Sequence, residues 1–346
     1  MDTFKEGRIS FFAKDEQTRD AKVFFNPARQ FDRNLNVLLF RSLGMKDLCG
    51  ADLFSASGIR GLRLSAETDA FKSILLNDIH TSSIIKKNVK ANEKRLNSDI
   101  ITESFNVTEI DRSKGLFDYI DIDPFGSPAF YAVHAMNNMK VGGIMALTAT
   151  DTSALYGSAN KACAIRYRAV SAKTSYYNEM GLRILLKRID DIAGVYRREI
   201  ESLFFDVRKH YIRVYVRIKR IRQSDDINHI YQCGRCPNRT LIEGGKCANC
   251  GSAMIKLGPI WSGKLFDRAL VQRMYEKSED ADEKDYLGIL RSEGDSITYY
   301  TTTEMASYLK QHEKKNGAIG TRTVLNNKGF RIDYCFKELL ENYRNL

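Results

Sequence analysis

Residues 48–61 read LCGADLFSASGIRG: a short apolar run, then a loop of small residues, then the start of a helix-like stretch. Further apolar runs follow, with helix-like segments between them. Strands joined by helices form right-handed βαβ units, and their parallel sheet has its ligand site at the carboxyl ends of the strands. The pattern therefore predicts an α/β sheet. Its strands are expected at LCGADLFS (48–55), ILLNDIH (74–80), FDYIDID (117–123) and GGIMALTATD (142–151).

The small-residue loop, residues 55–61, is the first candidate binding site. Ser57 and Gly58 let a ligand approach the backbone at a helix N-terminus. Asp78 ends the next predicted strand, 20 residues after Gly58, where an acidic side chain can accept hydrogen bonds from ribose hydroxyls. Both nicotinamide cofactors and S-adenosylmethionine contain that ribose. Two of the three dinucleotide glycines are serine here, and Arg60 is free to meet a carboxylate, so the methyl donor fits better.

The strand FDYIDID is followed by Pro124-Phe125-Gly126, which is the second candidate site. An exocyclic amine conjugated with its ring is a poor nucleophile, so a transferase for such amines needs an acceptor for its protons and an aromatic ring that stacks on the base. Asp123, the carbonyl of Pro124 and the ring of Phe125 can supply these parts. Asp121 points the same way but lies deeper. The alternative is an ordinary strand-to-loop turn.

Four cysteines, Cys233, Cys236, Cys247 and Cys250, have the spacing C-x2-C-x10-C-x2-C. Four thiolates suit tetrahedral zinc and leave no open position for chemistry, so we expect a structural zinc ion. A redox dithiol or reduced, unliganded cysteines are the alternatives. The remaining Cys49, Cys163 and Cys335 are isolated and are interpreted as small apolar residues.

Two segments follow the predicted sheet. The period is helical from about residue 171 to 210, and residues 211–221 (YIRVYVRIKRI) then alternate strictly. That alternation predicts a strand with a basic face, which either is solvated or contacts nucleic acid. QSDDINH, residues 223–229, is expected to form a hinge into a second domain.

Composition narrows the class of protein. The 346 residues are enough for two domains, and the net charge of +11 is consistent with a polyanionic partner such as nucleic acid, or simply with a basic soluble protein. Charges interrupt every apolar run before the length of a membrane span, and the charged N-terminus is unlike a secretory signal. A cytoplasmic protein without membrane contact is expected.

Six segments together resemble the tRNA guanine-26 N2-dimethyltransferase family. They occur in the family's order between residues 23 and 265. These segments are VFFNPARQFDRNLNV (23–37), DLFSASGIRGLR (52–63), DYIDIDPFGSP (118–128), TATDTSALYGSANKACAIRY (148–167), YYNEMGLRILL (176–186) and GPIWSGKL (258–265). The resemblance implies transfer of one or two methyl groups from S-adenosylmethionine to N2 of guanine 26 in tRNA.

The resemblance also implies roles for single residues. Arg33 and Arg60 reach the donor, Asp78 binds its ribose, and Asp123 is the catalytic aspartate. The aromatic residues that line the target-base pocket are Phe24, Tyr119 and Phe125. Where the family has D-A-N for the adenine, this chain has Ser104-Phe105-Asn106, so the contact passes to Phe105 or a backbone amide. F-F-N-P and Asp32-Arg33-Asn34 replace the family's F-Y-N-P and N-R-D.

The sequence thus predicts a Rossmann-like class I methyltransferase domain with an N-terminal extension, residues 1–222, and a smaller α+β domain with the zinc knuckle that binds tRNA, residues 223–346. A monomer is expected. Three rival classes are a methyltransferase for ribosomal RNA or DNA amines, a nicotinamide oxidoreductase, and a non-enzymatic zinc-bearing RNA-binding module. The first lacks a reason for the block 148–167, the second lacks its glycines, and the third leaves Asp123 without a role.

Overall fold

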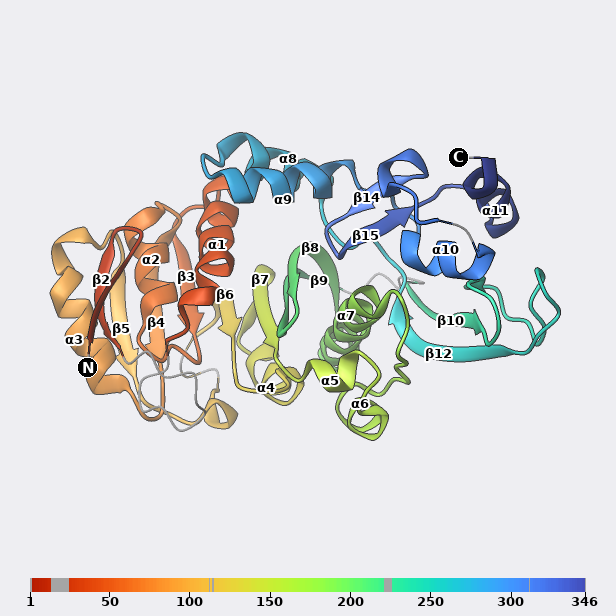
Figure 1. Ribbon diagram of the computed structural model, residues 1–346. Coiled ribbons are helices and arrows are strands. Elements are labelled where there is room, and N and C mark those ends of the chain that lie inside the picture. The colour runs from red at the N-terminus through yellow and green to blue at the C-terminus, as the bar shows by residue number, and fades with distance from the viewer. Residues whose placement is uncertain are drawn as a thin grey trace.

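A seven-stranded sheet forms the centre of the protein (Figure 1). The computed structural model describes residues 2–13, 25–111, 113, 115–220, 226–310 and 312–345. Along the sheet the strand order is β5-β4-β3-β6-β7-β9-β8. The strands are β3 (Leu48–Asp52), β4 (Phe71–Asn77), β5 (Asp99–Glu103), β6 (Phe117–Ile122), β7 (Met139–Ala149), β8 (Arg198–Arg208) and β9 (Tyr211–Arg220).

The order of the strands places the ligand site. Strands β5, β4, β3, β6 and β7 are parallel, and β9 runs antiparallel between β7 and β8. From β3 the chain goes outward through β4 and β5, and then returns to β6 on the other side of β3. A ligand crevice forms at such a switch point, outside the carboxyl ends of the strands. The expected Rossmann-like architecture is confirmed.

Helices cover the two halves of the sheet. Helices α2 and α3 pack on β3, β4 and β5, while α7 packs on β8 and β9 and also contacts α4 and α5. A small hairpin, β1 (Asp2–Glu6) with β2 (Ile9–Ala13), lies against α2 and α3. The helices are α1 (Gln30–Leu43), α2 (Ile59–Glu67), α3 (Ser82–Asn92), α4 (Ala129–Met136), α5 (Thr152–Leu155), α6 (Asn160–Tyr167) and α7 (Tyr177–Val195).

The segment predicted to be helical up to residue 210 contains a strand. Helix α7 ends at Val195, and Arg197 has φ +55°, which the helix cannot continue through. Strand β8 then begins at Arg198 and pairs with β9 along its whole length. The prediction was wrong there because the apolar run SLFF suits a buried strand and a buried helix equally well.

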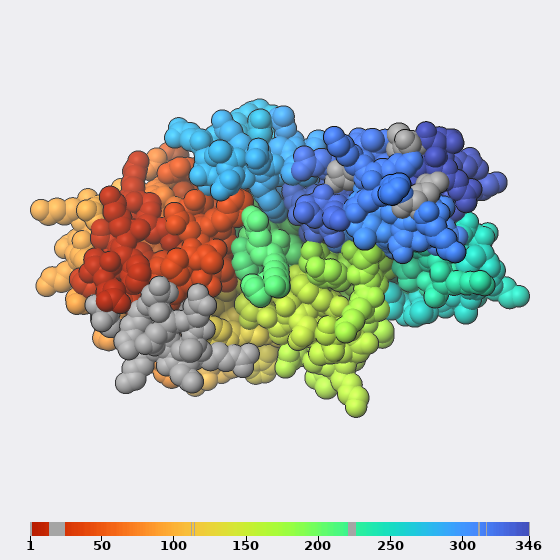
Figure 2. Space-filling model, viewed as in Figure 1, coloured from red at the N-terminus to blue at the C-terminus, as the bar shows by residue number. Residues whose placement is uncertain are grey.

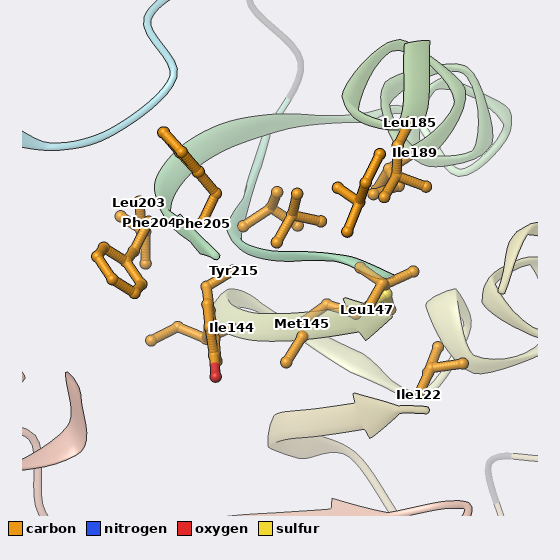
Figure 3. Close-up of a cluster of buried hydrophobic side chains, with 14 of the residues drawn as sticks. Ile122, Ile144, Met145, Leu147, Leu185, Ile189, Leu203, Phe204, Phe205 and Tyr215 are labelled. Carbon is orange, nitrogen blue, oxygen red and sulfur yellow. The ribbon is translucent and has the colours of Figure 1, made fainter. Parts of the chain in front are cut away.

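The packing of β9 corrects a second expectation. Neighbours on both sides bury this strand in the sheet, and both Arg213 and Tyr215 are at most 1% exposed. Figure 3 shows Tyr215 beside Leu203, Phe204 and Phe205 of β8, with α7 packed over the same sheet. The predicted basic face is therefore wrong for Arg213, which lies inside the protein. The side chains of Arg217 and Lys219, toward the end of the strand, are partly exposed.

Among the described residues, the C-terminal part contains two small antiparallel sheets and four α-helices. Its strands are β10 (Ile227–Cys233), β11 (Arg239–Thr240), β12 (Met254–Trp261), β13 (Tyr300–Thr301), β14 (Thr321–Thr323) and β15 (Asn326–Arg331). Its helices are α8 (Arg268–Lys277), α9 (Ala281–Ser292), α10 (Thr302–Leu309) and α11 (Phe336–Asn345). In the described part of the chain, no helix combines the length and apolarity needed to cross a membrane.

The C-terminal part also packs against helix α1 of the N-terminal part. Helix α8 contacts α1, and Arg273 Nε donates to the carbonyl of Ser42 over 3.2 Å. Figure 2 shows α8 and α9 against α1, while residues 226–261 extend to the end of the protein opposite β1 and β2. One hydrophobic cluster continues from the large sheet into α8 and α9, and a second forms around α10 and α11.

Candidate active site

The loop after β3, residues 53–58, forms one wall of the site. Ser55 N donates to Asn77 O over 3.0 Å, and Gly58, the N-cap residue of α2, has φ +80°. A Cβ at Gly58 would also lie 3.4 Å from side chains of Leu76 and Ile85. Among the described residues Ser57 Oγ is buried without a hydrogen-bond partner. The loop therefore has a glycine-dependent turn and an unused polar atom, as a ligand cradle does.

Asp78 lies at the carboxyl end of β4, beside this loop. Its Oδ2 accepts from Ala56 N over 3.0 Å, and its Oδ1 accepts from the backbone of His80 and Thr81. These bonds hold a half-buried carboxylate at the sheet edge. The position agrees with the expected ribose contact, which remains a prediction.

Asn77, which was not among the predicted site residues, joins two loops to the end of β4. Its Nδ2 donates to the carbonyls of Leu53 and Phe105, and its Oδ1 accepts from Phe105 N over 2.9 Å. Phe105 and Asn106 are thereby held beside the loop of residues 53–58. A polar residue that ends the apolar run ILLN was the available signal. Asn106 accepts from Thr108 N and so caps the 3-10 turn that follows it.

The turn after β6 carries Asp123 and Phe125. Gly126 has φ +89°, its N donates to Thr150 Oγ1 over 2.7 Å, and its carbonyl accepts from Thr150 N. The turn is thus fixed to the end of β7. Phe125 is 53% exposed, which is unusual for a phenylalanine and puts much of the ring within reach of a ligand.

Beneath Asp123 lies a buried network of charged side chains. Asp32 is fully buried and contacts Arg29, Arg60 and Arg213. Asp121, also fully buried, pairs with Arg213 and lies 3.6 Å from Arg60. Three carboxylates thus meet three guanidinium groups, and such pairing offsets the cost of burying charge. As expected, Asp121 lies deeper than Asp123.

Asp123 is the member of this network that lies nearest the surface. Its side chain is 18% exposed, and its Oδ2 is 3.1 Å from Arg29 Nη2 and 3.0 Å from Arg60 Nη2. Burial opposes ionisation, but the guanidinium groups of Arg29, Arg60 and Arg213 outweigh it and lower the pKa of Asp123. The carboxylate is therefore ionised at neutral pH and can accept hydrogen bonds.

Asp52 ends β3 next to Asp121 and behaves differently. Burial and the nearby carboxylates of Asp121 and Asp123 raise its pKa to about 8, although Arg60 opposes the shift. Asp52 therefore carries a proton at neutral pH. The carboxylates of Asp32, Asp121 and Asp123 are then left to balance the three arginines.

Three expected site residues lie elsewhere than predicted or are already paired. Tyr119 is 1% exposed and packs between Phe40 and Phe71, so it lies in the core below the site and does not line a base pocket. Its hydroxyl donates to Asp121. Arg60 is not free, because three carboxylates of the chain surround it.

Arg33 pairs with Glu6 of the N-terminal hairpin, with Nε–Oε1 2.7 Å, and also donates to the carbonyl of Asn26. Phe24 lies outside the residues that the structure describes. Arg29, Asp32 and Arg213 were missed as site residues because nothing local distinguishes them from surface charges. Only the meeting of η1 (the 3-10 turn Pro27–Arg29), α1 and β9 brings them under Asp123.

The four predicted zinc ligands do come together. The sulfur atoms of Cys233, Cys236, Cys247 and Cys250 all lie within 4.8 Å of one another. Cys233 Sγ accepts from the amides of residues 235 and 236, and Cys247 Sγ accepts from Asn238 Nδ2 over 3.2 Å. Amides directed at sulfur stabilise thiolates, so the set is suited to a metal ion.

Comparison with known proteins identifies relatives along nearly the whole chain. The family model described as N2,N2-dimethylguanosine tRNA methyltransferase matches residues 7–336. The tRNA (guanine(26)-N(2))-dimethyltransferase of Methanosphaera stadtmanae is 31% identical, over 98% of this chain and 96% of its own. The tRNA (guanine(26)-N(2)/guanine(27)-N(2))-dimethyltransferase of Aquifex aeolicus is 30% identical, over 94% and 91%. The solved complex of Trm1 from Pyrococcus horikoshii with S-adenosyl-L-methionine superposes with a TM-score of 0.86, at 27% identity and over 99% of each chain.

Proposed function

The chain belongs to the N2,N2-dimethylguanosine tRNA methyltransferase family, and we propose that it transfers one or two methyl groups from S-adenosylmethionine to N2 of guanine 26 in tRNA. One observation carries the assignment to this site. The ionised carboxylate of Asp123 and the exposed ring of Phe125 lie at the switch point, with Arg60 joining Asp123 to the helix that follows the donor loop.

The residues around the loop suit the methyl donor. Ser57 and Gly58 form the cradle, Asp78 offers a carboxylate to the ribose, and Phe105 with Asn106 borders the place of the adenine. Arg60 and Arg33 are the candidates for the carboxylate of the donor, and each must exchange a protein carboxylate for it. Bound S-adenosylmethionine would supply an electrophilic methyl group from its sulfonium to N2, and its sulfur would keep the electron pair of the C–S bond.

Asp123 acts on the acceptor. Its carboxylate accepts hydrogen bonds from the exocyclic amine, which concentrates electron density on N2 and directs the lone pair to the methyl group. A lowered pKa makes Asp123 a steady acceptor and a weak base. The proton that N2 must lose after methylation is strongly acidic, so water can take it.

The target guanine must leave its stack to reach this buried edge. Unstacking costs a few kcal/mol, and stacking on Phe125 offsets part of it. Phe24, which the resemblance also assigns to the base pocket, is proposed as a second ring on which the base can stack. Tyr119 is omitted, since it lies in the core.

The zinc site and the C-terminal part have structural and binding roles. We assign a structural zinc ion to the four cysteines, since four sulfur donors leave no open position for chemistry. Residues 223–346 are proposed as the tRNA-binding domain. Exposed cations on its surface, among them Arg235, Lys246 and Lys256, can contact phosphates.

The test is methyl transfer from labelled S-adenosylmethionine to an unmodified tRNA transcript. A transcript with guanine 26 changed to adenine is run beside it, and a third has guanine 27 changed. Label that disappears only with the first change supports the proposal. Label that persists in both variants assigns a different nucleotide. No label, although the donor binds in calorimetry, rejects tRNA as the substrate.

A further inference from the structure

Asp123 is held by two arginines that differ in what else they contact. Arg60 belongs to the first turn of α2, directly after the donor loop, and also contacts Asp32 and Asp121. Arg29 belongs to η1 and contacts Asp32 and Asp123. Arg60 is thus coupled to the donor loop, while Arg29 reaches Asp123 from a different element.

Arg29 is firmly supported. Its Nε donates to Asp32 Oδ2 over 2.8 Å, and its guanidinium lies 4.3 Å from the centre of the Tyr211 ring. Asn26 caps the turn, since its side chain accepts from Ala28 N over 2.9 Å. A planar guanidinium held on one edge by a carboxylate and on one face by a ring has a single orientation.

The bonds of Arg29 to Asp123 are asymmetric. Nη2 lies 3.1 Å from Oδ2, and Nη1 lies 3.4 Å from Oδ1. Arg60 also contacts Oδ2. Both arginines therefore grip one oxygen, and Oδ1 keeps the greater acceptor capacity for a ligand.

We propose that Arg29 is a positioning residue for methyl transfer: it fixes the carboxylate of Asp123 so that Oδ1 faces the acceptor amine, and it keeps doing so when Arg60 turns to the donor. The inference rests on the proposed function. It adds a residue to which neither the predicted site nor the resemblance assigns a role.

The charged groups around Asp123 set a signature in the pH profile. The cations are Arg29, Arg60 and Arg213, from η1, α2 and β9, and the anionic or protonated groups are Asp32, Asp52 and Asp121, from α1, β3 and β6. Removing Arg29 takes away one of the cations that favour the carboxylate. The pKa of Asp123 then rises, and the rate falls on the acid side at a higher pH than in the wild type.

The experiment compares Arg29→Met, Arg29→Lys and a matched variant, Arg208→Met. Arg208 is a suitable control because it also pairs with an aspartate, Asp206, and lies over a ring, Phe31, at 4.2 Å, without contact to Asp123. For each variant, kcat and KM on the tRNA transcript are measured from pH 3.5 to pH 8, so that the range includes the acid limb, and donor Kd is measured by calorimetry.

We expect Arg29→Met to lower kcat about 100-fold, as a misplaced catalytic group does, with donor affinity kept. The acid limb of its pH–rate profile should move to higher pH. Arg29→Lys should restore the position of this limb and part of the rate. Arg208→Met should match the wild type in rate and pH profile. Equal rates and pH profiles for Arg29→Met and wild type would overturn this inference alone. The inference would also be overturned if Arg29→Met lowered the rate equally at every pH and Arg29→Lys did not restore any of it. A wild type that methylates no tRNA overturns both this and the proposed function.

Discussion

Arg60 Nη2 lies 3.0 Å from the carboxylate of Asp123, so an arginine in the first turn of α2, after the loop that follows β3, directly contacts the turn after β6. The two halves of the site, on either side of the switch point between β3 and β6, therefore share an ion pair. Any donor group that attracts Arg60 changes the surroundings of Asp123. On the proposed function, one side chain therefore couples the proposed donor and acceptor sites.

Replacing Asp123 should separate chemistry from donor binding. We expect Asp123→Asn to lower methyl transfer by about 100-fold or more, because an amide is a weaker acceptor than a carboxylate in a preorganised site. Calorimetry should show that the donor still binds. Asp118→Asn is the control, since Asp118 lies on β6, the strand that leads to Asp123, but pairs with Lys140 at 2.9 Å, away from the network. Wild-type turnover by Asp123→Asn would remove the assignment.

Phe125 should act through its ring. Stacking of a base on an aromatic side chain contributes about 1–3 kcal/mol, so Phe125→Leu should raise KM for tRNA about tenfold while Phe125→Trp stays near the wild type. Phe130→Leu is the matched control, because Phe130 is 60% exposed and lies on α4. If both leucine variants lose affinity equally, the effect belongs to the apolar surface and not to Phe125.

Asp52 should make stability depend on pH. Its pKa is about 8 in the folded protein against 3.8 for an ordinary aspartate. Between these values the unfolded chain loses the proton and the folded protein keeps it, so the stability contributed by protonated Asp52 is lost as pH rises toward 8. The asparagine in Asp52→Asn cannot ionise, so this variant should not lose that stability as the pH rises. A pKa difference of one between folded and unfolded protein corresponds to about 1.4 kcal/mol of stability.

Urea unfolding checks this at pH 5 and pH 8.5. The free energy of unfolding of Asp52→Asn, minus that of the wild type, should be larger at pH 8.5 than at pH 5. A difference that is the same at both would show that Asp52 is already ionised in the folded protein.

Purified protein should contain about one zinc ion per chain, held by the four cysteines. Cys250→Ser should release it and lower the melting temperature, because binding of a structural metal contributes folding free energy. Cys335→Ser is the control, since Cys335 is exposed and lies outside the cluster. Elemental analysis that finds no zinc in the wild type, purified without chelator, would contradict the assignment.

Salt should weaken tRNA binding steeply. The logarithm of the binding constant falls linearly with the logarithm of the salt concentration. On a duplex, each phosphate that the protein neutralises adds about 0.9 to the steepness of that line. The double variant Arg235→Ala with Lys246→Ala should therefore have a slope smaller by about 2. Lys46→Ala with Lys72→Ala is the control: both are exposed, before or at the start of β3 and β4 and so at the opposite end of those strands from the site. If the slope of the Arg235→Ala, Lys246→Ala variant equals that of the wild type, the tRNA phosphates do not contact these two residues.

Much of the sheet was predictable because its signals are local. Small residues after β3, the acid at the end of β4 and the turn after β6 each follow their own strand, and the parallel order brings these ends together. The spacing of Cys233, Cys236, Cys247 and Cys250 likewise predicted a cluster that the fold assembles. Strand β8 was missed, since its apolar run has no period that distinguishes it from the preceding helix.

The sequence by itself determined the fold class, the small-residue loop after β3, the turn after β6 and the four clustered cysteines, because each depends on residues close together in the chain. Only the tertiary structure decided which charges are buried. Arg213 lies on a strand whose alternation is typical of a solvated face, yet β7 and β8 enclose it and place its guanidinium against Asp32 and Asp121. Arg29 and Arg60 meet at Asp123 from segments 31 residues apart in the chain. Burial and charge pairing arise from packing between distant elements, so no local pattern could predict them.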